Sequence, residues 1–204
     1  MNKDREIKPF LKAKLGDIPD DWEYRKIGEF ITDFRGGASL TPKDFVNCGV
    51  KVLPKIGVVR GGILSIDNEK QQYCSKEFAD DNPISQVDKK YLIVVLRDLV
   101  PSGPCIGLTV KIPNNDVLVL AQGVYGIIID ETKLNSEYLI QLSNSSWYRK
   151  YVRRIMVGST QVHIRNSEYQ DMAIPYTLLP EQKRIAAILG CWDSAIEKTE
   201  KLIT

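Results

Sequence analysis

The sequence predicts an α+β fold, in which a β-rich body is followed by a long C-terminal helix of the coiled-coil type. Two observations lead to this prediction. Up to about Asn135, short runs rich in Val and Ile alternate with Gly, Pro, Asn and Asp, which is the pattern of strands joined by turns. Beyond Asn135 the apolar residues take a helical spacing, and between Pro180 and Ile203 they form a heptad seam.

The chain of 204 residues is expected to begin with a lead-in, residues 1–14. This segment alternates in charge and lacks the apolar core and cleavage site of a secretory signal peptide. No apolar run approaches the length of about 18 residues that a membrane span needs, so we expect a cytoplasmic protein without a membrane segment. The β-rich domain is predicted over residues 15–178 and the C-terminal helix over residues 179–204.

Seven runs in the body are predicted strands because they are short, rich in β-branched residues and bounded by turn residues. They are residues 50–54, 56–59, 63–66, 91–97, 105–112, 117–121 and 124–130. Residues 34–45, before these runs, are predicted to be a loop, since they contain Gly36-Gly37 and Thr41-Pro42. After the last run, residues 135–156 are predicted to be helical.

The residues that usually carry chemistry are scarce. The chain holds four cysteines without a Cys-x-x-Cys pair and a single histidine, His163, so neither a zinc cluster nor a disulfide framework is expected. Phosphate-loop, dinucleotide-binding, zinc-protease and serine-hydrolase motifs are absent. His163 could join a Ser and an Asp in a triad, but no nucleophile motif accompanies it. We therefore predict no catalytic residue, no metal and no cofactor.

Positive charge gathers in one segment, although the formal net charge is only +2. No acidic residue lies between Glu137 and Glu168. The segment contains Arg149, Lys150, Arg153, Arg154 and Arg165. On a helix the first four form two rows of like charge at i,i+4, and each row costs a few tenths of a kcal/mol unless an anion lies against it. A solvated surface and a phosphate contact both remain open.

A small polar loop follows the basic helix. Ser159, Thr160 and Gln161 lie in it, next to Gly158 and just before His163. Hydroxyl and amide side chains beside a basic helix suit contacts with phosphates and base edges. The same residue types also occur in ordinary turns.

The C-terminal helix is predicted from its start signals and its seam. Pro180 suits the first turn, and Glu181 suits the positive end of the helix dipole. The seam consists of two interleaved sets, Ile185, Trp192 and Thr199, and Leu189, Ile196 and Ile203. Such a helix of about 23 residues would be about 35 Å long. It could pack on its own domain, but a partner helix is favoured because the seam continues to the last residues.

Both ends of the chain resemble the DNA-specificity subunits of type I restriction-modification systems. The segment "IPYTLLPEQKRIAAIL", residues 174–189, resembles the family's junction between a target-recognition domain and a conserved helix. Near the N-terminus, Gly16, Ile18, Pro19 and Trp22 resemble the family's entry motif. In the middle, "LPKIGVVRGGIL", residues 53–64, resembles the segment that ends in a Gly before a new strand. The resemblance covers about residues 15–203.

The resemblance implies a non-catalytic subunit that recognises double-stranded DNA. Its implied partners are methyltransferase subunits, a restriction and translocation subunit, and a second copy or second half of the specificity subunit bound through the C-terminal helix. The side chains predicted to bind DNA are Arg35, Lys55, Arg60, Arg149, Lys150, Arg153, Arg154, Ser159, Thr160, Gln161, His163 and Arg165. Among these, the cations are expected to anchor phosphates, and the polar residues of the loop are expected to lie near bases.

The sequence departs from the family in two respects. The usual subunit has two recognition domains and two helices, whereas this chain has one of each, so it is either a half-subunit that dimerises or a fragment. Trp192 also stands where a smaller aliphatic residue is expected. A homodimer would predict a split palindromic target with a fixed spacer. Two other functions stay open, namely an assembly module that acts only through its helix and a nuclease or methyltransferase in its own right.

Overall fold

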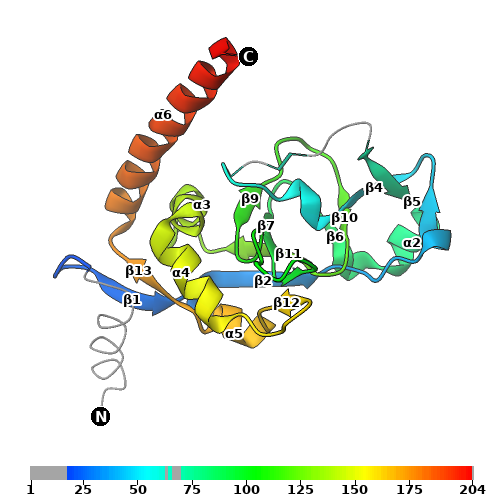
Figure 1. The fold of residues 1–204 in the computed structure, drawn as a ribbon, viewed down its shortest axis with the longest axis horizontal. Coiled ribbons are helices and arrows are strands. Elements are labelled where there is room, and N and C mark those ends of the chain that lie inside the picture. Colours follow the sequence, from blue (N-terminus) through cyan, green and yellow to red (C-terminus); the bar gives the residue numbers. More distant parts are fainter. Residues whose placement is uncertain (1–17, 63, 66–69, 204) are drawn as a thin grey trace.

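The computed structural model describes residues 18–62, 64–65 and 70–203 (Figure 1). The predicted lead-in, residues 1–14, lies outside the described residues. The body is β-rich, a long helix follows it, and the predicted α+β class is confirmed. No helix in the described ranges is long and apolar enough to cross a membrane.

An antiparallel sheet of four strands lies at the centre of the body. Its order is β2 (Ile31–Gly36), β11 (Val124–Ile129), β7 (Leu92–Val95) and β9 (Thr109–Lys111). A five-stranded sheet adjoins it, in the order β3 (Phe45–Val46), β5 (Gln72–Cys74), β4 (Val50–Leu53), β10 (Leu118–Leu120) and β6 (Gln86–Val87). In the second sheet, β4 and β10 pair in parallel and the other neighbours are antiparallel.

Two small ribbons complete the β structure. β1 (Glu23–Lys26) pairs with β13 (Ala173–Tyr176), which places the start of the described chain beside the segment that leads into the last helix. β8 (Arg97–Asp98) pairs with β12 (Val162–His163). Short helical turns connect the strands. They are η1 (Ile27–Phe30), η2 (Pro42–Asp44), η3 (Lys55–Gly57), α2 (Lys76–Asp81), η5 (Pro83–Ser85) and α5 (Asn166–Gln170).

Five of the seven predicted strand segments contain a strand, and the other two differ. The strand predicted at residues 56–59 is wrong, because η3 covers its start and Val58 makes only an isolated bridge to Leu64. In the strand predicted at residues 63–66, residues 63 and 66 lie outside the described residues, and Leu64 makes only the isolated bridge to Val58. The predicted loop at residues 34–45 is shorter than expected, because β2 continues to Gly36.

The helical prediction for residues 135–156 corresponds to two helices, α3 (Ser136–Asn144) and α4 (Ser146–Ile155). The break falls at Ser145, whose hydroxyl accepts the backbone N–H of Tyr148 and caps α4. Asn135 caps α3 in the same way. The N-cap role of Ser145 explains the break, since a Ser in this position favours a helix start over a helix interior.

The core has three parts, and the two larger ones lie on opposite faces of the central sheet. Along β7 and the residue after it, Leu92, Val94 and Leu96 pack with α3, α4 and α5, while Ile93 and Val95 pack toward the second sheet. The alternation follows from the two-residue period of a strand. Strand β7 is therefore buried on both of its faces, and exposed site residues come from the helices and loops around the sheet.

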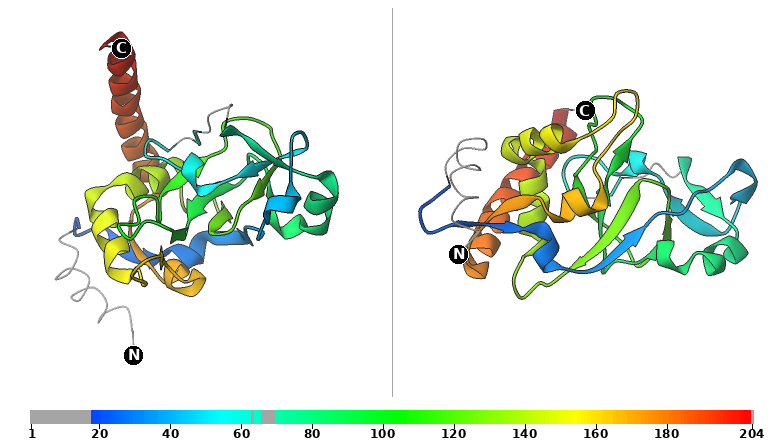
Figure 2. Two further views of the ribbon diagram at one scale, coloured as in Figure 1. Left: turned by 45° about the vertical axis from the view of Figure 1, so that its right-hand side comes forward. Right: turned by 90° about the horizontal axis from the view of Figure 1, so that it is seen from below.

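Helix α6 (Leu179–Ile203) begins against the body and then leaves it (Figures 1 and 2). Gln182 is fully buried at its start: its amide oxygen accepts the N–H of Asn135, and its nitrogen donates to the carbonyls of Lys133 and Thr177. Ala186 is also buried. From residue 191 to residue 203 every residue is exposed, so the buried contacts of α6 with the domain are confined to its first turns.

Candidate nucleic-acid interface

The polar loop is the tip of a tight hairpin. Val157 and His163 exchange two backbone hydrogen bonds, both 3.0 Å long, and close the loop between them. Gly158 has a φ of +111°, and a Cβ there would lie 2.0 Å from the carbonyl oxygen of Gln161. Only glycine fits this position. The hairpin exposes the side chains of residues 159–161 while buried Val162 anchors it.

The outer side of the β8–β12 ribbon carries a cation that the sequence patterns did not single out. Arg97 lies opposite His163, and Asp98 lies opposite Val162. Asp98 and Val162 are buried, whereas Arg97 is exposed and His163 is half-buried. Opposed residues of an antiparallel pair share a face, so Arg97 and His163 face outward together. The signal available in the sequence was a single arginine directly after the apolar run of residues 91–96.

Asp98 is a buried charge with internal partners. Its carboxylate accepts hydrogen bonds from the Lys55 ammonium and from the N–H of Val100, each 3.1 Å long. Burial raises the pKa of Asp98, but these hydrogen bonds, the positive charge of Lys55 and the N–H of Cys105 together bring that pKa below its ordinary value. Lys55 therefore ties η3 to β8, and its ammonium is engaged inside the protein, although it was predicted to anchor a phosphate.

Helix α4 presents only part of its charge to solvent. Lys150, Arg153 and Arg154 are exposed. Arg149 is only 5% exposed, and its guanidinium donates to the carbonyls of Ile106, Gly103 (3.2 Å) and Pro104 (3.0 Å). Burial lowers the pKa of Arg149, and the positive charges of Arg60 and Arg153 lower it further. Arg149 was predicted to contact DNA, and the structure shows its guanidinium holding a loop inside the domain.

A second predicted contact also has its partners within the body. Arg35 donates to the carboxylate of Asp33 at 3.0 Å and to the carbonyl of Gln86, and its guanidinium lies 4.8 Å from the ring centroid of Tyr91. None of these partners belongs to α4 or to the hairpin. The structure thus separates Arg35 from the other predicted contacts, since its guanidinium is held by β2, β6 and Tyr91.

The remaining predicted contacts belong to α4, to the hairpin after it and to neighbouring loops. Arg153 and Arg154 lie in its last turn, directly before the hairpin. Arg60 is exposed, and its charge acts on Arg149 from the loop after η3. Arg165 is also exposed, and it makes a 3.5 Å ion pair with Glu168 at the start of α5. Exposed cations and a polar hairpin therefore meet on this side of the body.

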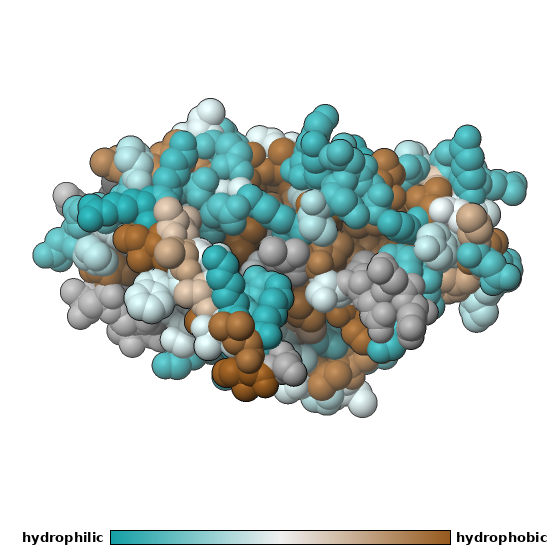
Figure 3. All heavy atoms as spheres, turned by 90° about the horizontal axis from the view of Figure 1, so that it is seen from above, coloured by the Kyte–Doolittle hydropathy of each residue, from teal (hydrophilic) through white to brown (hydrophobic). Residues whose placement is uncertain are grey.

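The predicted partner seam is open along most of α6. Ile185 packs against the protein's own core. Beyond it Leu189, Trp192, Ile196 and Ile203 are 40%, 65%, 54% and 81% exposed. Thr199 is exposed, and its hydroxyl donates to the carbonyl of Ala195. In the view toward the side on which α6 projects, apolar atoms lie at the surface among hydrophilic ones (Figure 3).

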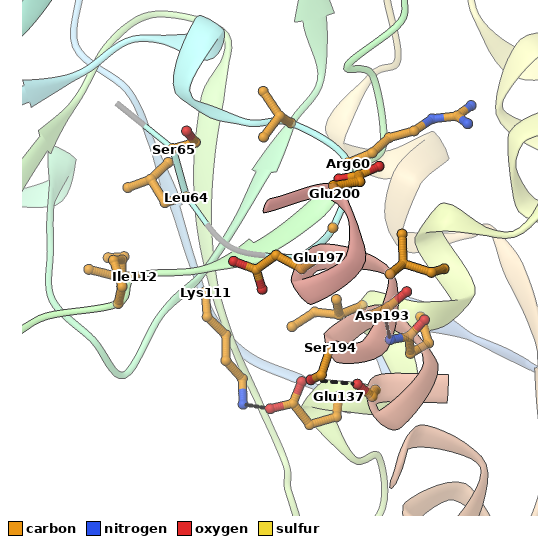
Figure 4. A pocket seen from close by; sticks show the side chains of 18 residues that line it. Arg60, Leu64, Ser65, Lys111, Ile112, Glu137, Asp193, Ser194, Glu197 and Glu200 are labelled. Atoms are coloured by element: carbon orange, nitrogen blue, oxygen red, sulfur yellow. Dashed lines mark hydrogen bonds and ion pairs between the residues drawn. The ribbon is translucent and has the colours of Figure 1, made fainter. Parts of the chain in front are cut away.

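A cleft of about 900 Å³ separates α6 from the loop around Arg60 (Figure 4). The acids Glu137, Asp193, Glu197 and Glu200 line it, together with the cations Arg60 and Lys111. Lys111 pairs with Glu137, and Gln141 donates to Asp193 at 2.6 Å. The second of these contacts braces α6 against α3. Within the described ranges no three His, Cys, Asp or Glu side chains are placed to hold a metal ion.

Nearly the whole chain matches the model of a protein family. The model of the type I restriction modification DNA specificity domain matches residues 19–204. The chain belongs to this family. The resemblance at the two ends of the chain is thereby confirmed. This specificity domain begins just before β1 and includes all of α6.

Two curated relatives of this specificity domain come from Methanocaldococcus jannaschii. The type I restriction enzyme MjaVIII specificity subunit is 28% identical over 200 residues, covering 96% of this chain and 45% of the relative. The MjaIX specificity subunit is 27% identical, covering 98% and 44%. The chain therefore spans a little under half the length of these relatives.

Solved structures of S subunits share the fold. The S subunit of a type I restriction-modification system from M. genitalium has a TM-score of 0.59 at 18% identity, covering 92% of this chain and 43% of that one. The HsdS subunit from Thermoanaerobacter tengcongensis has a TM-score of 0.62 at 16% identity, covering 96% and 46%. One specificity domain with one long helix corresponds to about half of each neighbour.

Proposed function

We propose that this chain recognises double-stranded DNA by sequence, as one half of a type I specificity subunit. The observation that carries the proposal is the group of exposed cations at the end of α4, which adjoins the polar hairpin of residues 158–162. Such a surface offers charge for phosphates and hydrogen-bonding groups for base edges in one place. Residues 15–178 form the reading domain, and residues 179–204 form the assembly helix.

Recognition takes place in the major groove, where each base pair presents a distinct pattern of donors and acceptors. Lys150, Arg153 and Arg165 hold phosphates on both sides of the hairpin. Gln161 offers both a donor and an acceptor, and Ser159 offers a hydroxyl that serves as either. The tight closure of the hairpin supports this role, because a rigid tip loses little conformational entropy on binding.

The chain itself is proposed to be non-catalytic and cytoplasmic. Methyl transfer, translocation and cleavage belong to partner subunits, which the specificity subunit directs to the target. The open seam of α6 supports a partner helix, supplied by a second copy or by the second half of a full subunit. A chain that acts as a nuclease would cut plasmid DNA in the presence of Mg²⁺, and no cleavage is expected here.

Titration of labelled duplex with Arg153→Ala and Lys150→Ala variants tests the DNA contact. Each change is expected to weaken binding to all sequences alike and to reduce the slope of log K against log salt concentration by about 1. Lys198→Ala, an exposed change on the far part of α6, is the matched control and should bind as the wild type does. Unchanged affinity of both α4 variants for specific and random duplex would leave only the assembly function.

A further inference from the structure

A second loop leaves the β8–β12 ribbon at the same end as the polar hairpin. Arg97 pairs with His163 and Asp98 pairs with Val162, in antiparallel register. The next residue after β8 is Leu99, and the residue before β12 is Gln161. Antiparallel strands run in opposite directions, so these two residues leave the ribbon side by side. Residues 99–102 thus lie next to the tip of the hairpin.

The second loop is held on both sides by buried charges. At its start, Asp98 accepts the N–H of Val100. At its end, Arg149 donates to the carbonyls of residues 103, 104 and 106. Gly103 has a φ of +53°, and a Cβ there would lie 2.6 Å from the sulfur of Met156, just after α4. Both ends of the loop are therefore held by the body, and its end packs against the residue after α4.

The tip of this loop is apolar and open to solvent. Leu99 is 58% exposed and Val100 is 49% exposed. Val157, at the base of the neighbouring hairpin, is 36% exposed. Leu99 and Val100 form an apolar patch on one loop, with Val157 exposed on the adjoining one, and an apolar patch with a polar rim is typical of a contact site.

The charge of the rim identifies the partner. Residues 99–104 and 156–165 contain no acidic residue, and the carboxylate at their base, Asp98, is buried. Around the patch stand exposed Arg97, half-buried His163 and, at the end of α4, exposed Arg153. A positive rim matches a phosphate backbone, and the group that an aliphatic side chain meets in the major groove is the methyl group of thymine.

We propose that Leu99 and Val100 determine part of the sequence specificity by packing against thymine C5-methyl groups, beside the polar contacts of the hairpin. This inference rests on the proposed DNA recognition. It assigns to the loop of residues 99–102 a role in reading bases, and to Arg149 and Asp98 the role of positioning residues that hold this loop.

The test begins with selection of a target from random duplex by the wild-type chain. Each thymine of the selected site is then replaced by deoxyuridine, which lacks only the methyl group. Removing a methyl that packs against an aliphatic side chain should lower affinity about fourfold. In a Leu99→Ala, Val100→Ala variant the same replacement should have no further effect, because the two partners of one contact are coupled.

Ile84→Ala is the matched control, since Ile84 is 70% exposed on η5, and it should bind as the wild type does. Circular dichroism should show all variants folded, because the altered side chains are exposed.

If the chain selects a target but no thymine is required, or uracil is tolerated everywhere, the inference fails and the proposed function stands. The inference also fails alone if the double variant keeps full affinity and full sensitivity to uracil, and the patch would then serve a protein partner. If no duplex is bound at all, both fail.

Discussion

Arg149 and Arg153 show how far residue type alone can predict a role. They lie one helical turn apart on α4, with the same charge, and the sequence pattern assigned both to DNA. Yet Arg149 is buried and its guanidinium donates to three carbonyls, while Arg153 is exposed. The difference is made by the loop that ends at Ile106, about 40 residues earlier in the chain, and no local pattern in α4 reports that a loop will pack there.

Replacing Arg149 by Leu is expected to lower the free energy of unfolding by about 3 kcal/mol, because buried carbonyls lose their donors. Arg153→Leu is the matched control on the same helix, and its free energy of unfolding should stay within about 0.5 kcal/mol of the wild type. Chemical denaturation monitored by tryptophan fluorescence measures both. If the two variants were equally stable, the three carbonyls would not need the guanidinium as their hydrogen-bond donor.

Asp98 leads to a prediction about pH. Its pKa is below the ordinary value in the folded protein, so the charged carboxylate stabilises the fold above about pH 4, and this contribution is lost as the pH falls through the lowered pKa. Asp98→Asn should therefore be less stable than the wild type by about 1–2 kcal/mol at pH 7. The difference should shrink below about pH 4 in denaturation curves. A constant difference at all pH values would assign the effect to packing instead of charge.

Elements with a strong local pattern could be predicted from sequence. The apolar, β-branched run of residues 91–97 and the seam of residues 180–203 each led to the observed strand or helix. The break at Ser145 and the turn at η3 could not be placed in the same way. At Ser145 a short polar contact, the cap on Tyr148, outweighs the apolar helical pattern that continues across the break. At η3 the tertiary surroundings outweigh an apolar run in the same way.

The hairpin depends on the backbone conformation of one glycine. Gly158→Ala should destabilise it by about 1–3 kcal/mol, because the new Cβ would clash with the carbonyl of Gln161 and a positive φ is unfavourable for alanine. We expect lost discrimination between specific and random duplex, while non-specific binding through α4 remains. Ile84→Ala, which changes an exposed side chain on η5 away from the hairpin, should retain the discrimination. Competition binding separates the two outcomes.

At the scale of the whole molecule, two observations point to the same conclusion, that α6 pairs with a partner helix. They are the open seam of α6 and the share of its relatives that the chain spans. The chain spans a little under half of its relatives, and the helix that leaves the body lacks, within the described residues, a partner for Trp192 and Ile196. Association through this seam would bury those side chains and add hydrophobic stabilisation, each contributing up to about 1.5–3 kcal/mol.

Light scattering measures whether a second copy supplies the partner. Leu189→Asp with Ile196→Asp should split a dimer, because two charges per helix would be buried in the seam. Ala187→Asp with Lys198→Asp is the matched control, since at about 100° per residue these positions lie on the other side of the helix. If the control variant dissociates equally, the added charge causes the dissociation, and the seam is not the dimer interface.

A dimer formed through α6 would also determine the form of the DNA target. Two copies related by a two-fold axis present the same hairpin and the same loop 99–102 in opposite orientations, so the selected target should contain two identical inverted half-sites. The spacer should be fixed, because α6 is a continuous helix that holds the two reading surfaces at one separation. Selection from random duplex followed by insertion of one base pair into the spacer tests this, and binding should fall toward the level of a single half-site. A target with one half-site, bound equally well with any flanking sequence, would mean that each copy reads alone and that the other half-site is read by a different chain.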